Sequence, residues 1–323
     1  MFDALTFIPV LALAFLASLG ERWRPAAGMT YLLLGLIDLL MLIAGAAVVA
    51  AGLNPWEISS IAPELQGPSQ AILASGVGWA LLATGLLGAV LLVPAVRRGV
   101  TRPIPLAPEG PLAVTVLHLV AVILGLSAAQ LILMPYIWEM APEALVTPAG
   151  LVVQAVSFLL LALLGVGFPL RRNLAGVRRR LNLVAPSVRQ ILVAVGLTAL
   201  GVAGTAVIES LWIRYDPQGA LLFEERLGNL FRAFESPVGI AIVGLAAGIG
   251  EEILFRGALQ PRLGLIPTAV VFTLIHSYYG LTPAWLWIAI IGFGLGVLRA
   301  KTNTTTCILF HALYNSTSFF LGS

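Results

Sequence analysis

Long apolar stretches alternate with short polar or charged connections along the chain. A hydrocarbon core about 30 Å thick takes roughly 20 apolar helical residues to cross. Stretches of this order predict ten membrane helices, near residues 4–20, 30–53, 71–96, 112–134, 148–170, 191–212, 237–257, 265–280, 284–300 and 304–321. The eighth and the last two are short or polar, so we expect them to be tilted, re-entrant or enclosed by other helices.

Basic residues alternate between successive connections, as they do when Lys and Arg remain on the cytoplasmic side. Of the 18 Lys and Arg residues, the even-numbered connections contain only Arg214, Arg226 and Arg232, which share their loop with acidic residues. The densest basic group, from Arg171 to Arg189, lies in an odd-numbered connection. We therefore expect a multi-pass protein of a prokaryotic plasma membrane, with both termini outside.

The composition agrees with this interpretation, because 59% of the residues are hydrophobic and only 10% are charged. A soluble domain carries about a quarter charged residues, so a water-soluble globule is excluded. The net charge of +3 is spread over the predicted inner loops and lacks the aromatic interleaving of nucleic-acid binding. We expect membrane lipid as a partner and no nucleic acid. The fold class predicted is an all-α polytopic transmembrane bundle of about ten helices.

The Arg-rich stretch also marks the strongest internal boundary, since a new apolar run follows it after Pro186. We divide the chain there into residues 1–190, membrane helices of unknown role, and residues 191–323. The two halves show no repeat, so the paired architecture of many transporters is not supported. In the first half only Asp38 and His118 are ionisable and deep within predicted spans. One interhelical hydrogen bond for each would explain them, and we favour that structural role over a functional one.

Polar residues accumulate in the second half, beginning with the adjacent carboxylates of Glu251 and Glu252. Two such groups in a membrane helix repel one another unless each has a compensating partner. Glu252 and Arg256 are four residues apart, share a helix face and are expected to form an ion pair. Glu251 lies about 100° further round an α-helix, which leaves it to face a polar interior. A buried carboxylate there is suited to act as a general base towards water.

Two further clusters follow, Phe272 with His276 and His311 with Asn315, each at a spacing of four residues. His311 and Asn315 would project from one face of the last helix and could donate hydrogen bonds to a developing oxyanion. His276 could hold a water against Glu251 or carry its proton. A purely structural network of ion pairs and hydrogen bonds is the competing interpretation.

The sequence signatures of other classes of hydrolase are absent from the chain. The chain contains no His-Glu-x-x-His and no Gly-x-Ser-x-Gly. The acid of Tyr215-Asp216 lies in a predicted loop, and no second intramembrane aspartate follows to complete a dyad. The glutamate and histidine set is the remaining candidate.

Glu-Glu-x-x-x-Arg, Phe-x-x-x-His and His-x-x-x-Asn, in this order on successive membrane helices, resemble the three motifs of the CAAX protease and bacteriocin-processing (CPBP, Abi) family of intramembrane proteases. Each motif alone is weak, but three in order are fairly specific. The resemblance covers roughly residue 190 to the end. All seven motif positions are filled, by Glu251, Glu252, Arg256, Phe272, His276, His311 and Asn315.

The resemblance implies a CAAX-protease-like core at residues 191–323 in which Glu251 and His276 activate water. It further implies that His311 and Asn315 stabilise the tetrahedral intermediate. Glu252, Arg256 and Phe272 would organise the site. No cofactor is firmly implied, although the family is often labelled metalloprotease; a zinc ion would take Glu251, His276 and His311 as its candidate ligands. We favour direct activation of water, because Glu252 is committed to Arg256 by spacing and Asn315 is a poor zinc ligand.

The leading hypothesis is therefore an intramembrane endopeptidase acting on a membrane-associated peptide or protein. A non-catalytic membrane binding protein or scaffold, with the same residues as a polar core, is the alternative. A proton-coupled transporter is a weaker third, because neither internal symmetry nor broken helices in both halves are evident.

Overall fold

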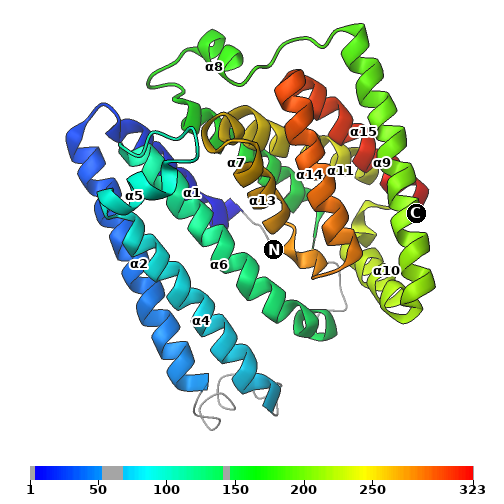
Figure 1. Ribbon diagram of the computed structural model, residues 1–323, viewed down its shortest axis with the longest axis horizontal. Coiled ribbons are helices and arrows are strands. Elements are labelled where there is room, and N and C mark those ends of the chain that lie inside the picture. The colour runs from blue at the N-terminus through cyan, green and yellow to red at the C-terminus, as the bar shows by residue number, and fades with distance from the viewer. Residues whose placement is uncertain (1–3, 53–67, 141–145, 323) are drawn as a thin grey trace. The chain divides into compact units, whose positions relative to one another are not determined.

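The computed structural model describes residues 4–52, 68–140 and 146–322, which form helices, turns and loops without a strand (Figure 1). The helices up to residue 166 are α1 (Ala4–Gly20), α2 (Arg24–Gly52), α4 (Pro68–Leu91), α5 (Pro94–Thr101), α6 (Pro111–Met140) and α7 (Pro148–Val166). Those that follow are α8 (Leu174–Arg180), α9 (Val188–Tyr215), α10 (Pro217–Phe231), α11 (Pro237–Leu245), α12 (Gln260–Leu263), α13 (Leu265–Leu274), α14 (Pro283–Lys301) and α15 (Thr304–Gly322). The prediction of an all-α fold is confirmed.

Four short segments complete the helical content of the part of the chain that the structure describes. Two are π-helical, η2 (Ala246–Glu251) and η3 (Ile253–Leu259), and with Glu252 between them they connect α11 to α12. The other two are 3-10 helices, η1 (Arg232–Phe234) and η4 (Ser277–Tyr279). The π-helical stretch contains the predicted glutamate motif, and π-helical turns are frequent at functional sites.

Polar side chains and prolines fix where several of the membrane helices begin. Ser187 caps α9 by accepting a hydrogen bond from the Gln190 backbone N–H, and the Gln190 side chain accepts one in return from the Ser187 backbone. Thr147, Ser236 and Thr282 cap α7, α11 and α14, each followed by proline in the first turn. These caps satisfy backbone N–H groups at helix starts, and proline there costs no hydrogen bond.

Among the described residues, six helices are long and apolar enough to cross a membrane: Arg24–Ala51, Pro111–Leu133, Pro148–Val166, Val188–Tyr215, Pro237–Leu263 and Pro283–Lys301. A seventh span results if Gly76–Leu91 and Pro94–Thr101, bent by 99° at their junction, cross together. Phe7–Gly20 and Leu265–Leu274 are apolar but shorter. The prediction of a multi-pass membrane protein is confirmed with six or more spans, while the number ten stays a prediction.

The chain forms two compact units, which we describe separately. Unit 1 contains residues 1–18, 140–273 and 282–323, and unit 2 contains residues 19–139 and 274–281. The functional division predicted at residue 190 concerns activity rather than compactness, and it stays a prediction.

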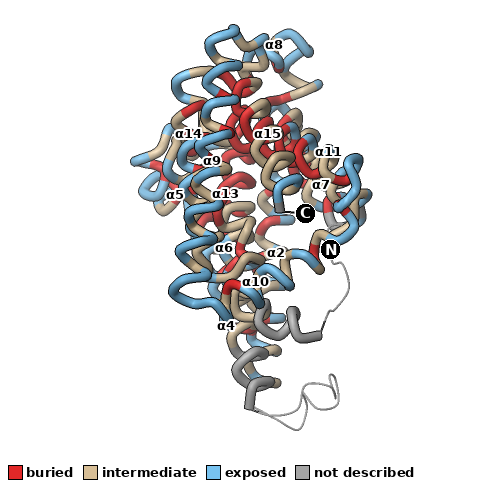
Figure 2. The backbone as a smooth tube through the Cα atoms, turned by 90° about the vertical axis from the view of Figure 1, so that its right-hand side faces the viewer, coloured by how far each residue is buried: buried red, intermediate tan, exposed pale blue. Residues whose placement is uncertain are grey.

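Buried side chains in unit 1 form two apolar clusters around the motif-bearing helices. One joins α7, α8 and η3 through Ala162, Val177, Leu181, Ile253 and Ala258. The other joins α9, α14 and α15 through Ala194, Leu295, Leu298, Cys307 and Phe310. Figure 2 shows many of the buried backbone positions around α7 and α15. Five motif residues of unit 1 are thus buried between packed helices: Glu251, Glu252, Arg256, Phe272 and His311.

In unit 2 the two ionisable residues singled out in the sequence bind each other. His118 Nε2 lies 3.2 Å from Asp38 Oδ2, and His118 Nδ1 lies 2.9 Å from the Val114 carbonyl oxygen. A carbonyl only accepts, so Nδ1 carries a proton. The contact between Nε2 and Oδ2 then needs one more proton, held by the carboxyl or by the imidazole. The pair links α2 and α6, as a structural hydrogen bond was expected to do.

Candidate active site

The helical segment that carries the glutamates is the most enclosed of the six long apolar helices. In Pro237–Leu263, 61% of the most apolar 18-residue stretch is buried, against 17% of the corresponding stretch in Pro148–Val166 and in Val188–Tyr215. Glycines allow this enclosure, because a Cβ added to Gly248 would lie 2.9 Å from the Ala312 Cβ and one added to Gly250 would lie 2.7 Å from the Ala155 Cα. Close approach of α7 and α15 therefore seals Glu251 and Glu252 from lipid.

Glu252 is the centre of the buried network. Its Oε1 accepts a hydrogen bond from Arg256 Nη1 at 3.2 Å and lies 2.8 Å from His311 Nδ1. The glutamate and the arginine are fully buried, and the histidine is 4% exposed. The predicted ion pair is confirmed. The bond from His311, 59 residues away in the chain, was not foreseen, because the sequence paired this histidine with Asn315 alone.

Arg256 connects the network to α14. Its Nη2 donates to the Gly292 carbonyl at 2.8 Å, and its guanidinium carbon lies 4.2 Å from the centre of the Phe272 ring. A buried guanidinium needs compensation, and here a carboxylate and a carbonyl bind the two Nη atoms while an aromatic face covers the group. Arg299 Nε also donates to the Arg256 carbonyl at 3.2 Å. Arg256 thus links Glu252 to α14, while its role in organising a catalytic site stays a prediction.

Phe272 packs between the charged residues as well as against neighbouring rings. Its ring meets the His311 ring edge-on at 6.0 Å between centroids and the Phe255 ring at 5.4 Å. A Cβ on Gly292 would lie 2.7 Å from Phe272 Cδ1, so α13 and α14 approach closely only because residue 292 is glycine. Phe272 therefore contacts both His311 and Arg256, and its predicted organising role stays a prediction.

Glu251 immediately precedes this network and is itself 6% exposed. It is the last residue of η2, so the α-helical geometry assumed from the sequence is wrong at this point. The wider π-turn changes the angle between Glu251 and Glu252, and the apolar residues around both give no periodicity that would have revealed it.

His311 and Asn315 both lie on α15, one turn apart. The Glu252 carboxylate only accepts, so His311 Nδ1 carries the proton in their hydrogen bond. His311 Nε2 and the half-buried Asn315 amide make no hydrogen bond with other described residues. Both are therefore available to a ligand on this side of α15.

His276 lies beyond the end of α13, in the turn that precedes η4, and belongs to unit 2. The expectation that it projects from a helix together with Phe272 is wrong, because helix α13 ends at Leu274. Its ring packs near the rings of Tyr278 and Tyr279, with centroids at 5.9 and 6.4 Å. The predicted sharing of a water with Glu251 stays a prediction.

Two residues of α6 hold this turn, and sequence reasoning missed both. Ser127 Oγ donates to the Leu274 carbonyl at 2.7 Å, and Ser277 Oγ donates to Gln130 Oε1 at 2.7 Å. Their only signal in the sequence is the presence of two polar residues, three apart, within an apolar helix. The bonds flank His276 on both sides and restrict the backbone that carries it.

The side chains that commonly bind a catalytic metal ion are those of His, Cys, Asp and Glu. Among the described residues, no three His, Cys, Asp or Glu side chains come together in a group that could hold a metal ion. His311 Nδ1 and Glu252 Oε1 are engaged with each other, which further reduces the donor set. These residues do not present the three protein ligands that catalytic zinc takes, so we derive no step through a metal.

Comparison with known families decides the relationship. Residues 233–317 match the family model described as type II CAAX prenyl endopeptidase Rce1-like. The C-terminal region is an Rce1-like domain. The matched range of the Rce1-like domain includes all seven motif residues, from Glu251 to Asn315. The predicted relationship to the CAAX-protease family is confirmed. No curated protein and no solved structure matches the chain.

Proposed function

We propose that this protein is an intramembrane endopeptidase of the CAAX type, which hydrolyses a peptide bond in a membrane-associated peptide or protein. The observation that carries the proposal is the buried network of Glu252, Arg256 and His311, beside the second carboxylate of Glu251, inside the Rce1-like domain. A carboxylate pair in a membrane helix is costly, and a hydrolytic site gives both members a use.

In the proposed reaction Glu251 takes a proton from a water molecule, whose oxygen attacks the scissile carbonyl. His276 holds the same water and shares the proton. The C–N bond then breaks as the proton passes to the leaving amine. This assignment requires that Glu251 and His276 reach one water when substrate is bound.

The tetrahedral intermediate carries an oxyanion, for which His311 and Asn315 are the proposed donors. With Nδ1 held by Glu252, the histidine presents Nε2 to the substrate. To donate there, the ring must carry protons on both nitrogens. Arg256 and His311 share the one negative charge of Glu252, so the developing oxyanion supplies the second negative charge. Glu252 is then a positioning residue for His311, and Arg256 and Phe272 hold Glu252 and the ring in place.

The membrane orientation is also proposed. Arg-rich connections such as Arg171 to Arg189 are placed on the cytoplasmic side of a prokaryotic plasma membrane, and both termini outside. Modification of single engineered cysteines by a membrane-impermeant thiol reagent in whole cells would test this, after Cys307, the one native cysteine, is replaced by serine.

The test of activity is cleavage of membrane-tethered peptides, with and without a prenyl group, by the full chain reconstituted in vesicles. Glu251→Gln should abolish cleavage while the fold is retained, and the matched variant Glu224→Gln, at an exposed carboxylate on α10, should cleave normally. Cleavage should survive chelation of divalent metals.

Each other outcome has a defined meaning. Loss of cleavage after chelation would instead favour a zinc-dependent mechanism, with Glu251, His276 and His311 as the candidate ligands. Equal cleavage by Glu251→Gln and wild type would overturn the role of this glutamate. No cleavage across a broad library by folded wild-type protein would favour the non-catalytic binding protein, in which the buried network has only a structural role.

A further inference from the structure

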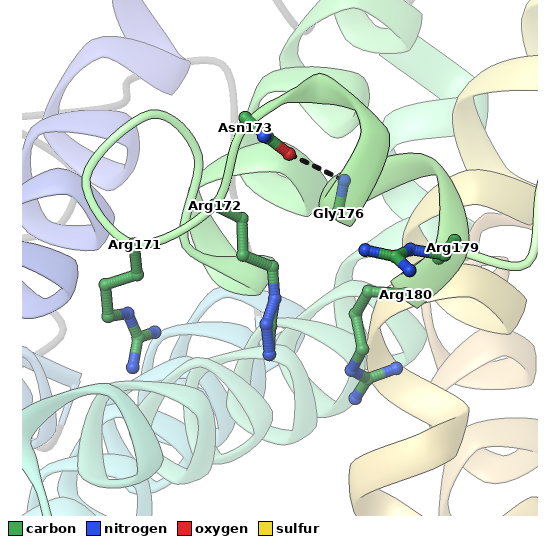
Figure 3. A pocket seen from close by; sticks show the side chains of 6 residues that line it. All are labelled: Arg171, Arg172, Asn173, Gly176, Arg179 and Arg180. Atoms are coloured by element: carbon green, nitrogen blue, oxygen red, sulfur yellow. Dashed lines mark hydrogen bonds between the residues drawn. The ribbon is translucent and has the colours of Figure 1, made fainter.

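The connection between α7 and α9 contains an open, strongly basic pocket that the proposed protease site does not use. Its volume is about 530 Å³, and it is lined by Arg171, Arg172, Asn173, Gly176, Arg179 and Arg180. Figure 3 shows Arg171, Arg172 and Arg180 extending to the same side of this turn, with Arg179 beside Arg180. Four guanidinium groups therefore gather around one space in unit 1.

This positive charge has no acidic counterpart nearby in the chain. No Asp or Glu occurs between Glu143 and Glu209. Arg172, Arg179 and Arg180 form no ion pair with any described residue. Burial lowers the pKa of Arg180, and the positive charges of Arg172 and Arg299 lower it further. The charges of Arg172, Arg179 and Arg180 thus gather in the pocket without an acidic partner, and an anion would relieve their repulsion.

The position of the pocket restricts what that anion can be. It lies between the end of α7 at Val166 and the start of α9 at Val188, two helices long and apolar enough to cross a membrane. Such a connection lies at the level of the lipid headgroups. Leu174 and Val184 in the same connection, and Val188 where α9 begins, are exposed, so this region presents apolar as well as basic side chains. This combination suits a ligand that is anionic at one end and apolar at the other.

We propose that the arginine pocket between α7 and α9 binds the phosphate group of an anionic phospholipid, with the acyl chains against the exposed apolar residues. Guanidinium groups bind phosphate oxygens in pairs of parallel hydrogen bonds, which favours arginine over lysine for this task. All four basic residues that line the pocket are arginines. Anionic lipids are enriched in the cytoplasmic leaflet, where basic connections reside.

The segment that forms the pocket packs against the helices of the proposed protease site and forms hydrogen bonds with them. Leu181, next to Arg180, is fully buried and packs with Ile253 and Ala258 of η3. Its carbonyl accepts a hydrogen bond from Thr304 Oγ1 at 2.6 Å, at the start of α15. Arg299, whose charge acts on Arg180, donates to the Arg256 carbonyl. A lipid bound at the arginines should therefore stabilise unit 1 as well as occupy its surface.

The test is native mass spectrometry of the full chain in detergent, titrated with phosphatidylglycerol and, separately, with phosphatidylcholine of the same acyl chains. We expect at least one phosphatidylglycerol to bind more tightly than any phosphatidylcholine. The triple variant Arg172→Gln, Arg179→Gln and Arg180→Gln should weaken this first binding step at least about tenfold, because each arginine near an anionic surface contributes to affinity.

The matched control removes the same charge elsewhere. The control is the triple variant Arg22→Gln, Arg24→Gln and Arg98→Gln. These three arginines are exposed and lie in other predicted inner connections. This variant should change the affinity less than about twofold, since the proposed pocket is intact. The single variant Arg172→Gln at an exposed pocket position serves if the triple pocket variant does not fold. In that case we expect Arg172→Gln to weaken phosphatidylglycerol binding several-fold, and an unchanged affinity would contradict the proposed lipid site.

Equal losses in the pocket and control variants would overturn the proposal, because they would reveal attraction by net charge alone. Equal affinity for the two lipids would do the same. A third arm adds inorganic phosphate at millimolar concentration. If phosphate displaces phosphatidylglycerol and binds the pocket as tightly, the site is for soluble phosphate, and the lipid assignment is wrong.

Discussion

Glu252 and His311 share a hydrogen bond of 2.8 Å between Oε1 and Nδ1, which joins the glutamate helix to α15 inside unit 1. The same oxygen binds Arg256, so one carboxylate orients the histidine and balances the guanidinium. The Glu-Glu-x-x-x-Arg and His-x-x-x-Asn motifs are therefore joined through one carboxylate, and removal of Glu252 should disturb both.

Glu252→Ala should lower the free energy of unfolding by about 3–5 kcal/mol, because it leaves a fully buried Arg256 without its carboxylate. Glu252→Gln keeps an acceptor oxygen and should cost less, about 1–3 kcal/mol. Denaturation in detergent micelles would measure both. Glu224→Ala, at an exposed carboxylate, should stay within about 0.5 kcal/mol of wild type. The network has no special importance if all three variants are equally stable.

Gly292→Ala should destabilise the protein by about 1–3 kcal/mol through overpacking. The new Cβ would lie 2.7 Å from Phe272 Cδ1, and this ring cannot retreat, since it is 2% exposed and packs on Arg256. Gly294→Ala, two residues along α14, meets nothing within 4 Å and should cause no loss. Thermal unfolding of the two variants side by side checks the difference. Similar melting temperatures would show that α13 and α14 separate easily.

The helices and the Glu252–Arg256 pair could be predicted because the signals are local. An apolar run of sufficient length forms a membrane helix in nearly any context, and a spacing of four residues places two side chains on one face. Motif order then indicated the family. The end of α13 was misjudged because the sequence after Leu274 remains rich in aromatic residues, which resemble a continuing span.

The remaining features depend on contacts that no local pattern encodes. His311 and Glu252 are 59 residues apart, and Ser277 and Gln130 are 147 apart. Apart from Glu251, Glu252 and Arg256, the π-helical segment is apolar or glycine throughout, so helical periodicity is absent and the turn type cannot be inferred from the sequence. Asp38 and His118 were recognised as needing partners, but that each is the other's partner follows only from the structure.

The Asp38–His118 pair predicts an asymmetry between two substitutions of the aspartate. Asp38→Asn should cost no more than about 1 kcal/mol, because the amide N–H can donate to His118 Nε2 while Nδ1–H still donates to Val114. Asp38→Ala leaves a buried ring nitrogen unsatisfied and should cost about 1–3 kcal/mol. Chemical denaturation measures both values.

Gly88 provides a second test of the same pair. A Cβ at this position would collide with the Asp38 carboxyl group, whereas Gly28 meets nothing within 4 Å. Gly88→Ala should therefore destabilise unit 2 clearly, and Gly28→Ala should not.

If Asp38→Asn proved as harmful as Asp38→Ala, the pair would require a charge, and the shared proton would lie on the imidazole.

The hydrogen bonds from α6 predict a catalytic role for a helix outside the Rce1-like match. Given the proposed function, Ser277→Ala and Gln130→Leu should each lower kcat about tenfold with little change in KM, because both loosen the backbone next to His276. Steady-state cleavage of a tethered peptide measures the two constants. Ser210→Ala, which removes an exposed hydroxyl on α9 bonded only within its own helix, is the control and should cleave normally.

The double variant of Ser277 and Gln130 separates positioning from general stability. If the two residues act through one hydrogen bond, the double variant should lose no more kcat than either single variant. A merely structural contact would lower the melting temperature and leave kcat intact at temperatures where the protein is folded. Multiplied losses in the double variant would mean that the two residues act independently, so their shared hydrogen bond would not be the means by which α6 holds the His276 turn.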